Sequence, residues 1–123
     1  MTDILLIEDD ELLREQLRNG LVRAGHDVRE AESGDKGLAL FQAQPAELVI
    51  TDLVMDDGEG VETIRELRVL CSVTPIIAIS GNSLYLDNSV KLGANLGLLK
   101  PFTIGALLDA VGEALGERDA RSA

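Results

Sequence analysis

Acidic, hydroxyl and amino side chains stand at the ends of several short apolar stretches of this chain. Glu8 and Asp9 follow ILLI, Asp52 follows LVIT, Ser80 ends PIIAIS, and Lys100 follows LGLL. Clustered carboxylates repel one another and raise one another's pKa, and a hard cation relieves that conflict. Mg²⁺ prefers oxygen ligands, retains waters and often bridges a protein to a phosphate. These residue types therefore predict a magnesium site that handles a phosphoryl group.

A phosphoryl group needs a nucleophile and groups that hold its oxygens. Asp52 is the candidate nucleophile, because it falls between the acidic pair and the lysine in the expected sheet. Lys100 can pair with a carboxylate at rest and then offer its charge to a phosphate oxygen. Ser80 can donate a hydrogen bond to another oxygen. Each residue alone also has an ordinary explanation, and for Asp10 a helix cap is the main one.

The elements that must position these residues alternate regularly along the chain. Apolar runs of strand length are each followed by a segment with helical spacing. Strands are expected over 4–7, 27–31, 48–50, 75–79 and 96–99. Helices are expected over 11–24, 34–44, 61–70, 84–92 and 104–115, with a polar segment from Gly116 onward.

This alternation predicts an α/β fold, with a parallel sheet covered by helices on both faces. The first, third, fourth and fifth strands are apolar throughout, which is typical of strands buried on both faces, and the second alternates like an edge strand. A flavodoxin-like, doubly wound, five-stranded sheet of order 2-1-3-4-5 with five helices satisfies this pattern. All strands then end at one edge, where such sheets bind ligands.

Size and charge limit the functions that the chain can have. Its 123 residues fit one domain, expected over 1–118, with a polar tail at 119–123. A net charge of −11 repels nucleic acids, so no direct nucleic-acid binding is expected. No apolar run could span a membrane, the first residues do not resemble a secretory signal, and a cytoplasmic location follows by default. The single cysteine, Cys71, excludes an internal disulfide.

In this order and spacing, the residues resemble a receiver domain of the two-component response-regulator family. The resemblance runs from ILLIEDD through VITDLVM and PIIAIS to LGANLGLLKPF and covers essentially the whole chain. It implies Mg²⁺ as cofactor, with Asp9 as a direct ligand and Glu8 as a ligand through water. Asp52 and the backbone carbonyl of Val54 complete the protein ligands.

The resemblance also implies a function. Asp52 accepts a phosphoryl group from a histidine kinase or a histidine phosphotransfer protein, while Ser80 and Lys100 bind the phosphoryl oxygens. Pro101 resembles the family's cis-proline. Such a chain catalyses only its own phosphorylation and dephosphorylation, so it is not an enzyme in the usual sense. Phosphorylation switches the binding of a target protein to the face formed by the fourth helix, fifth strand and fifth helix.

Three residues depart from the family pattern. Asp56 stands where proline is usual, and Gly81 where alanine is common. Gly97 takes the place, three residues before the lysine, of a large residue that rotates inward on activation. A glycine has no rotamer to switch, and within a strand it often marks the close approach of another group. We hypothesise that Tyr85 partly fills the space beside Gly97.

Two other classes fit less well, and one alternative stays open. A phosphatase of the haloacid dehalogenase type needs a second aspartate two residues after the nucleophile, where this chain has Val54. A flavodoxin-like cofactor binder needs a glycine- and hydroxyl-rich loop after the first strand, where Glu8 and Asp9 would repel a phosphate. The open alternative is a receiver-like adaptor that partners bind without phosphorylation, which the altered loop and Gly97 allow.

Overall fold

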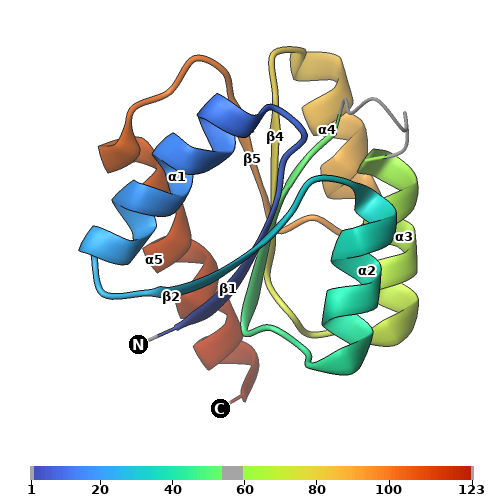
Figure 1. Cartoon of the computed structure of the whole chain (residues 1–123). Helices are drawn as coiled ribbons and strands as arrows, with labels where there is room; N and C mark the ends of the chain where they lie inside the picture. The colour runs from blue at the N-terminus through green and yellow to red at the C-terminus, as the bar shows by residue number, and fades with distance from the viewer. Residues whose placement is uncertain (1, 54–59, 123) are drawn as a thin grey trace.

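The fold is a five-stranded parallel sheet between two layers of helices (Figure 1). The computed structural model describes residues 2–53 and 60–122. The strands are β1 (Asp3–Ile7), β2 (Asp27–Ala31), β3 (Leu48–Asp52), β4 (Ile76–Ser80) and β5 (Leu96–Leu99). The helices are α1 (Glu11–Arg23), α2 (Gly34–Ala43), α3 (Gly60–Leu70), α4 (Ser83–Leu92) and α5 (Ile104–Ser122). The order β2-β1-β3-β4-β5 confirms the predicted topology.

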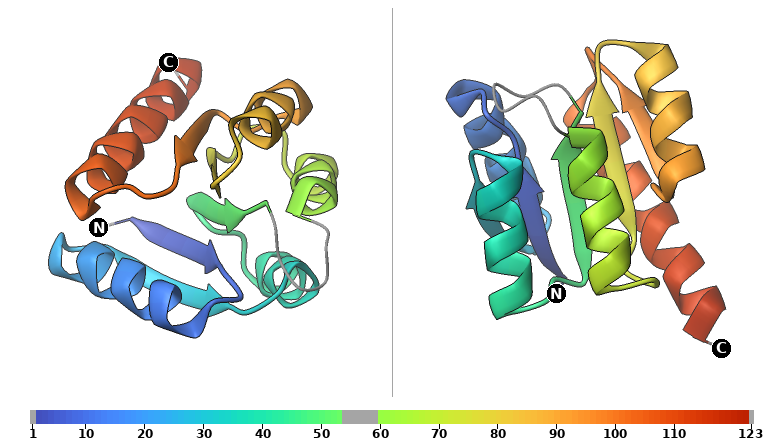
Figure 2. Two further views of the ribbon diagram at one scale, coloured as in Figure 1. Left: turned by 90° about the horizontal axis from the view of Figure 1, so that it is seen from above. Right: turned by 90° about the vertical axis from the view of Figure 1, so that its right-hand side faces the viewer.

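The two faces of the sheet carry separate hydrophobic cores. α1 and α5 cover one face, and α2, α3 and α4 cover the other (Figure 2). Successive residues of a strand point to opposite faces. Accordingly Ile4 and Leu6 of β1 pack in the core under α1 and α5, whereas Leu5 and Ile7 pack in the core on the opposite face. Both faces of the central strands are covered, which is why those strands are apolar at nearly every position.

The prediction that β5 is buried on both faces is wrong. β5 is the second edge of the sheet, and each of its residues is half-buried or exposed, with Leu99 50% exposed. An apolar run of four residues does not reveal how completely its two faces are covered. The run LGLL therefore indicated a strand correctly, and the predicted order placed it at the edge, but its exposure was not predicted.

Polar side chains fix where the helices begin. Asp10 accepts a hydrogen bond from the backbone N–H of Leu13 at 3.2 Å, as predicted for a cap of α1. Thr103 accepts one from the backbone N–H of Ala106 at 3.0 Å at the start of α5. α5 then continues to Ser122, beyond the end at residue 115 that the sequence pattern indicated.

One arginine ties the far end of α4 to α3. This residue is Arg68. Its Nε donates a hydrogen bond to the carbonyl of Gly93 at 2.9 Å and its Nη1 donates to the carbonyl of Thr74 at 2.7 Å. Its Nη2 donates to Oδ1 of Asn95 at 2.9 Å. Gly93 has φ 126°, a left-handed conformation that glycine adopts without strain. The C-terminal end of α4 is therefore held by a planar side chain from its neighbour.

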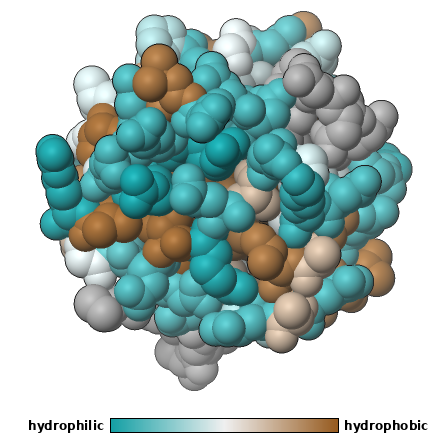
Figure 3. Space-filling model, in the orientation of Figure 1, coloured by the Kyte–Doolittle hydropathy of each residue, from teal (hydrophilic) through white to brown (hydrophobic). Residues whose placement is uncertain are grey.

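The outer surface is largely hydrophilic. In the orientation of Figure 1, polar residues cover most of the space-filling surface and apolar residues form separate patches between them (Figure 3). Across the described parts of the chain, no helix combines the length and the apolar character needed to cross a membrane.

Candidate functional site

The parallel register brings the polar strand ends together. Ile7 of β1 pairs with Thr51, and the next residue of β3, Asp52, pairs with Ile79 of β4. Ser80 then pairs with Leu99 of β5. The residues that follow these last pairs lie together at the edge formed by the carboxyl ends of the strands, because every strand runs in the same direction. This edge is where the sequence placed the candidate site.

Lys100 connects two carboxylates at this edge. Its Nζ lies 2.7 Å from Oδ2 of Asp52 and 3.3 Å from Oε1 of Glu8. Both carboxylates are buried, with Asp52 3% and Glu8 0% exposed. Burial lowers the pKa of Lys100, but the hydrogen bond and the charge of Asp52 outweigh burial, and the net effect is a raised pKa. The ammonium group therefore stays charged beside Asp52.

Glu8 is the most perturbed carboxyl group of the site. Burial, followed by repulsion from Asp52, raises the pKa of Glu8 to about 8 from its ordinary value of 4.5. The backbone N–H of Asp10, which donates to Oε2 of Glu8 at 3.1 Å, and the charge of Lys100 act in the opposite direction. Lys100 and the Asp10 N–H therefore do not compensate for the burial of a charged Glu8, and Glu8 holds its proton up to about pH 8 in the metal-free chain.

The three predicted acidic ligands form a cluster. Glu8, Asp9 and Asp52 each offer one carboxylate oxygen, and these oxygens lie within 4.8 Å of one another. Clustered carboxylate oxygens, two of them from buried residues, suit a hard divalent cation, and Mg²⁺ retains waters where the protein supplies no ligand. The residues present therefore fit Mg²⁺. The fourth predicted ligand, the carbonyl of Val54, and the altered loop position Asp56 lie outside the described residues.

Ser80 is buried beside the start of α4. It is 1% exposed, and its Oγ accepts a hydrogen bond from the backbone N–H of Asn82 at 3.0 Å. Oδ1 of Asn82 in turn accepts from the backbone N–H groups of Leu84 at 2.9 Å and Tyr85 at 3.3 Å. Asn82 was missed by the sequence interpretation, although an asparagine between a strand and a helical stretch is a common N-cap. It links the Ser80 hydroxyl to the first turn of α4.

The hypothesis that Tyr85 fills the space beside Gly97 is wrong. A Cβ atom on Gly97 would lie 3.1 Å from Cβ and 3.3 Å from Cδ2 of Leu86. Tyr85 instead is 46% exposed on the surface of α4. Adjacent helical residues point in directions about 100° apart, so sequence distance from Ser80 did not show which one faces β5. α4 packs directly onto Gly97 through Leu86.

A doubly wound sheet with a lysine-bridged acidic cluster at its C-terminal edge defines a class of phosphoryl-handling signalling domains, and the comparisons agree. The family model of the response regulator receiver domain matches residues 4–112, and the chain belongs to this family. Its members serve two-component systems as signalling domains rather than as conventional enzymes.

Relatives and solved structures extend this result. The chain is 38% identical over 125 residues to the KDP operon transcriptional regulatory protein KdpE of Escherichia coli, covering 100% of this chain and 55% of that protein. It is 29% identical over 114 residues to the chemotaxis protein CheY of Halobacterium salinarum, covering 91% and 95%. A CheY-like receiver domain from Methanospirillum hungatei superposes with a TM-score of 0.91 at 25% identity, covering 98% of each chain.

The relatives named as transcriptional regulators are longer than the relative named as a chemotaxis protein. The chain spans about half the length of most of the curated relatives that it matches, and these are named as transcriptional regulators. The prediction that this chain does not contact nucleic acid therefore stays a prediction.

Proposed function

We propose that this chain is a phosphoacceptor receiver in a two-component phosphorelay, in which phosphorylation of Asp52 switches protein binding. The donor is a histidine kinase or a histidine phosphotransfer protein. The observation that carries the proposal is the pairing of Lys100 with a buried Asp52 beside the acidic cluster. A carboxylate with a cation at 2.7 Å and metal-binding neighbours is equipped to accept an anionic group.

The transfer proceeds by attack of a carboxylate oxygen of Asp52 on phosphorus. The new O–P bond forms as the bond from phosphorus to the donor's imidazole nitrogen breaks, and that nitrogen keeps the electron pair. Lys100 and Ser80 bind phosphoryl oxygens and hold them in place. Hydrolysis of the acyl phosphate later returns Asp52 and releases inorganic phosphate.

Four protein groups would hold Mg²⁺ in this proposal: Asp9 directly, Glu8 through water, Asp52, and the backbone carbonyl of Val54. When bound, Mg²⁺ supplies positive charge that offsets the carboxylates and the incoming phosphoryl oxygens. The support for this set is the acidic cluster formed by Glu8, Asp9 and Asp52.

The readout surface is the face of α4, β5 and α5. Large apolar residues are exposed there, with Leu84 68%, Tyr85 46% and Leu99 50% exposed. Exposed apolar groups of this kind are common at protein-binding surfaces. Residues 1–118 form the receiver and bind proteins rather than nucleic acid, consistent with a net charge of −11.

Phosphoryl uptake tests the proposal directly. The chain is incubated with acetyl phosphate and Mg²⁺, and its intact mass is measured with and without a chelator. We expect a mass gain of one phosphoryl group that Asp52→Asn and chelation abolish and that Asp87→Asn, a change at an exposed carboxylate of α4, leaves intact. A chain that gains no phosphoryl group at any donor concentration contradicts the proposal.

The contact between Gly97 and Leu86 favours one second function, a receiver-like adaptor that partners bind without phosphorylation. Leu86 fills the space beside Gly97 in which the larger side chain of other family members would rotate. Absence of phosphoryl uptake, together with partner binding that Asp52→Asn does not change, would support the adaptor.

A further inference from the structure

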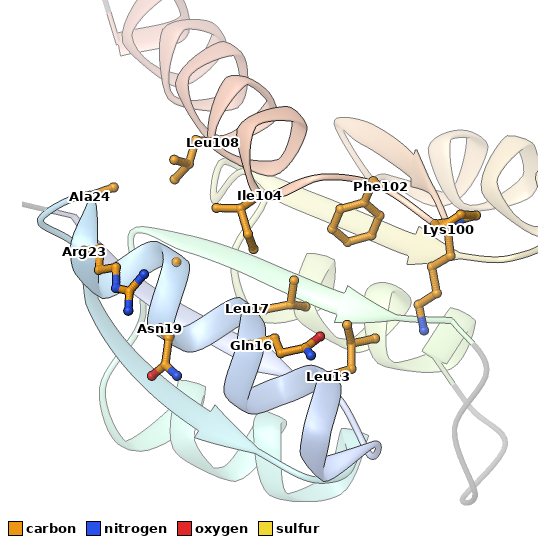
Figure 4. A pocket seen from close by; sticks show the side chains of 12 residues that line it. Leu13, Gln16, Leu17, Asn19, Arg23, Ala24, Lys100, Phe102, Ile104 and Leu108 are labelled. Atoms are coloured by element: carbon orange, nitrogen blue, oxygen red, sulfur yellow. The ribbon is translucent and has the colours of Figure 1, made fainter.

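A groove runs between α1 and α5 on the side of the sheet away from α3 (Figure 4). Its volume is about 1060 Å³, slightly above the range of about 300–1,000 Å³ that is typical of small-molecule sites. Gly20 lies along it, where a Cβ atom would come within 2.7 Å of Cγ2 of Ile104. The glycine therefore lets α1 approach α5 closely at that point while the groove stays open beside it.

The lining of the groove has an apolar part and a polar margin. The apolar part comes from both helices and the segment before α5, and it consists of Leu13, Leu17, Phe102, Ile104 and Leu108. The polar margin is one side of α1, because residues three and four apart share a helix face. It consists of Gln16, Asn19 and Arg23, and none of these side chains bonds to a residue that the structure describes.

The charge of the groove differs from that of the chain. The chain has 22 acidic residues against 11 basic ones, yet the charged residues that line the groove are Arg23 and Lys100. Over residues 2–53 and 60–116, every arginine except Arg23 pairs with an acidic side chain or a backbone oxygen; they are Arg14, Arg18, Arg29, Arg65 and Arg68. A cation without a partner beside an apolar surface complements an anionic ligand with an apolar body.

We propose that this groove binds a small anionic amphiphile, namely an aliphatic chain with one terminal carboxylate. The carboxylate pairs with the guanidinium of Arg23, next to the amide of Asn19, and the aliphatic chain lies along Leu17, Ile104 and Phe102. The stretch of α1 from Leu13 to Arg23 covers ten residue rises, or about 15 Å, which suits an aliphatic chain of medium length.

The methyl end of this ligand would lie beside Lys100, on the side of the lysine away from Asp52. Lys100 lies at the end of the groove opposite Arg23 (Figure 4), and Pro101 also lines the groove. The lysine stem lines the groove while its Nζ bonds Asp52 and Glu8 on the other side. A long side chain can present an apolar stem and a charged tip to different surroundings in this way. The ligand would thus pack against the residue that holds the phosphoacceptor.

Dodecanoate is the probe that tests the groove. Amide spectra of the isotope-labelled chain are recorded while sodium dodecanoate is added below the concentration at which it forms micelles. We expect saturable shifts concentrated in α1, α5 and residues 100–102, and binding about tenfold tighter than that of dodecanol, which lacks the charge. No Mg²⁺ or phosphodonor is present, so the result does not depend on phosphorylation of Asp52.

Two matched arginine variants separate a built site from general surface binding. Arg23→Gln should weaken dodecanoate binding about tenfold, the loss expected for one charge-assisted hydrogen bond. Arg18→Gln lies on the same helix, removes an ion pair with Glu30 at 3.6 Å and does not line the groove, so its affinity should equal that of the wild type. Unchanged melting temperatures confirm that both variants are folded.

Three results would overturn the proposal. They are shifts that do not saturate or that scatter over the surface, equal affinities in the Arg23→Gln and Arg18→Gln variants, and equal affinity for dodecanol. A groove that does not bind dodecanoate but binds a helix of a partner protein would likewise count against a small-molecule site.

Discussion

The Nζ atom of Lys100 lies 2.7 Å from Oδ2 of Asp52, although 48 positions of sequence separate the two residues. The contact exists because β3 and β5 run in the same direction, so that their carboxyl ends lie on the same side of the molecule with only β4 between them. The same ammonium group reaches Glu8, so one cation serves two buried carboxylates.

Removing this cation should destabilise the metal-free chain. Loss of one partner from a buried ion pair costs about 3–5 kcal/mol, and because the side chain of Lys100 is 29% exposed we expect about 2 kcal/mol for Lys100→Met. Urea unfolding at pH 8 measures the change. Lys91→Met, at an exposed lysine in the last turn of α4, should cost less than about 0.5 kcal/mol.

Added Mg²⁺ extends this test. The cation should restore part of the stability of Lys100→Met, because it replaces positive charge beside the same carboxylates. Equal unfolding free energies for Lys100→Met and Lys91→Met would show that Lys100 does not stabilise the cluster.

Glu8 should make stability depend on pH in an unusual direction. Its pKa is about 8 in the folded chain against an ordinary 4.5, so the folded state binds its proton more tightly. The resulting stabilisation is complete below pH 4.5 and is lost as pH rises from 4.5 to about 8. Urea unfolding of the metal-free chain and of Glu8→Gln across this range checks it, since the variant should lack this component.

Binding of Mg²⁺ should release a proton from the same group. Below pH 8 the cation competes with the proton on Glu8, so its affinity should fall as the pH is lowered. Calorimetric titrations of Mg²⁺ in two buffers of different ionisation enthalpy measure the protons released. Equal proton release by the wild type and Glu8→Gln would assign the proton to another group.

Gly97 should tolerate even a methyl group poorly. The nearest atom to a new Cβ is Cβ of Leu86, which is fixed to the backbone of α4, so the helix itself must shift. We expect Gly97→Ala to cost about 1 kcal/mol, and Leu86→Gly, which removes that Cβ, to couple with it in a double-mutant cycle. At Gly81 a Cβ meets nothing within 4 Å, and Gly81→Ala should stay within about 0.5 kcal/mol of the wild type. Additive effects of Gly97→Ala and Leu86→Gly would refute the contact.

Arg68 should control the far end of α4. Arg68→Leu leaves carbonyl groups of Gly93, Cys71 and Thr74 without this donor and should cost about 2–3 kcal/mol. Arg65→Leu, which removes only an exposed ion pair of 3.9 Å with Glu62, should cost less than about 0.5 kcal/mol. Hydrogen exchange should accelerate at residues 92–95 in the first variant alone. Unchanged exchange there would mean that other contacts hold the helix end.

The sequence predicted the order of elements and the place of the site, because both follow from short-range patterns. Strand ends meet in any parallel sheet, so Glu8, Asp52 and Lys100 could be brought together without coordinates. Asp10 was predicted as a cap for the same local reason.

What the sequence could not show depends on direction and on distant partners. Whether Leu86 or Tyr85 faces β5 depends on the rotation of α4 about its axis, which the packing sets. The predicted order placed β5 at the edge of the sheet, but the half-exposed state of its side chains depends on how the helices cover it, not on its residues. The bonds from Arg68 to Gly93 and Asn95 join separate elements, and no local pattern marks them.

The site residues occupy one edge of the sheet, and both chain ends lie toward the opposite edge (Figure 1). The connections at that opposite edge include residues 24–26, 44–47 and 93–95. A circular permutant of this chain that joins residues 2 and 122 by a flexible linker and opens the chain at residues 44–47 would keep every strand end in place. The proposed phosphoryl uptake by Asp52 should therefore survive in this permutant, because the permutation changes the order of the elements along the chain but not the place of the strand ends.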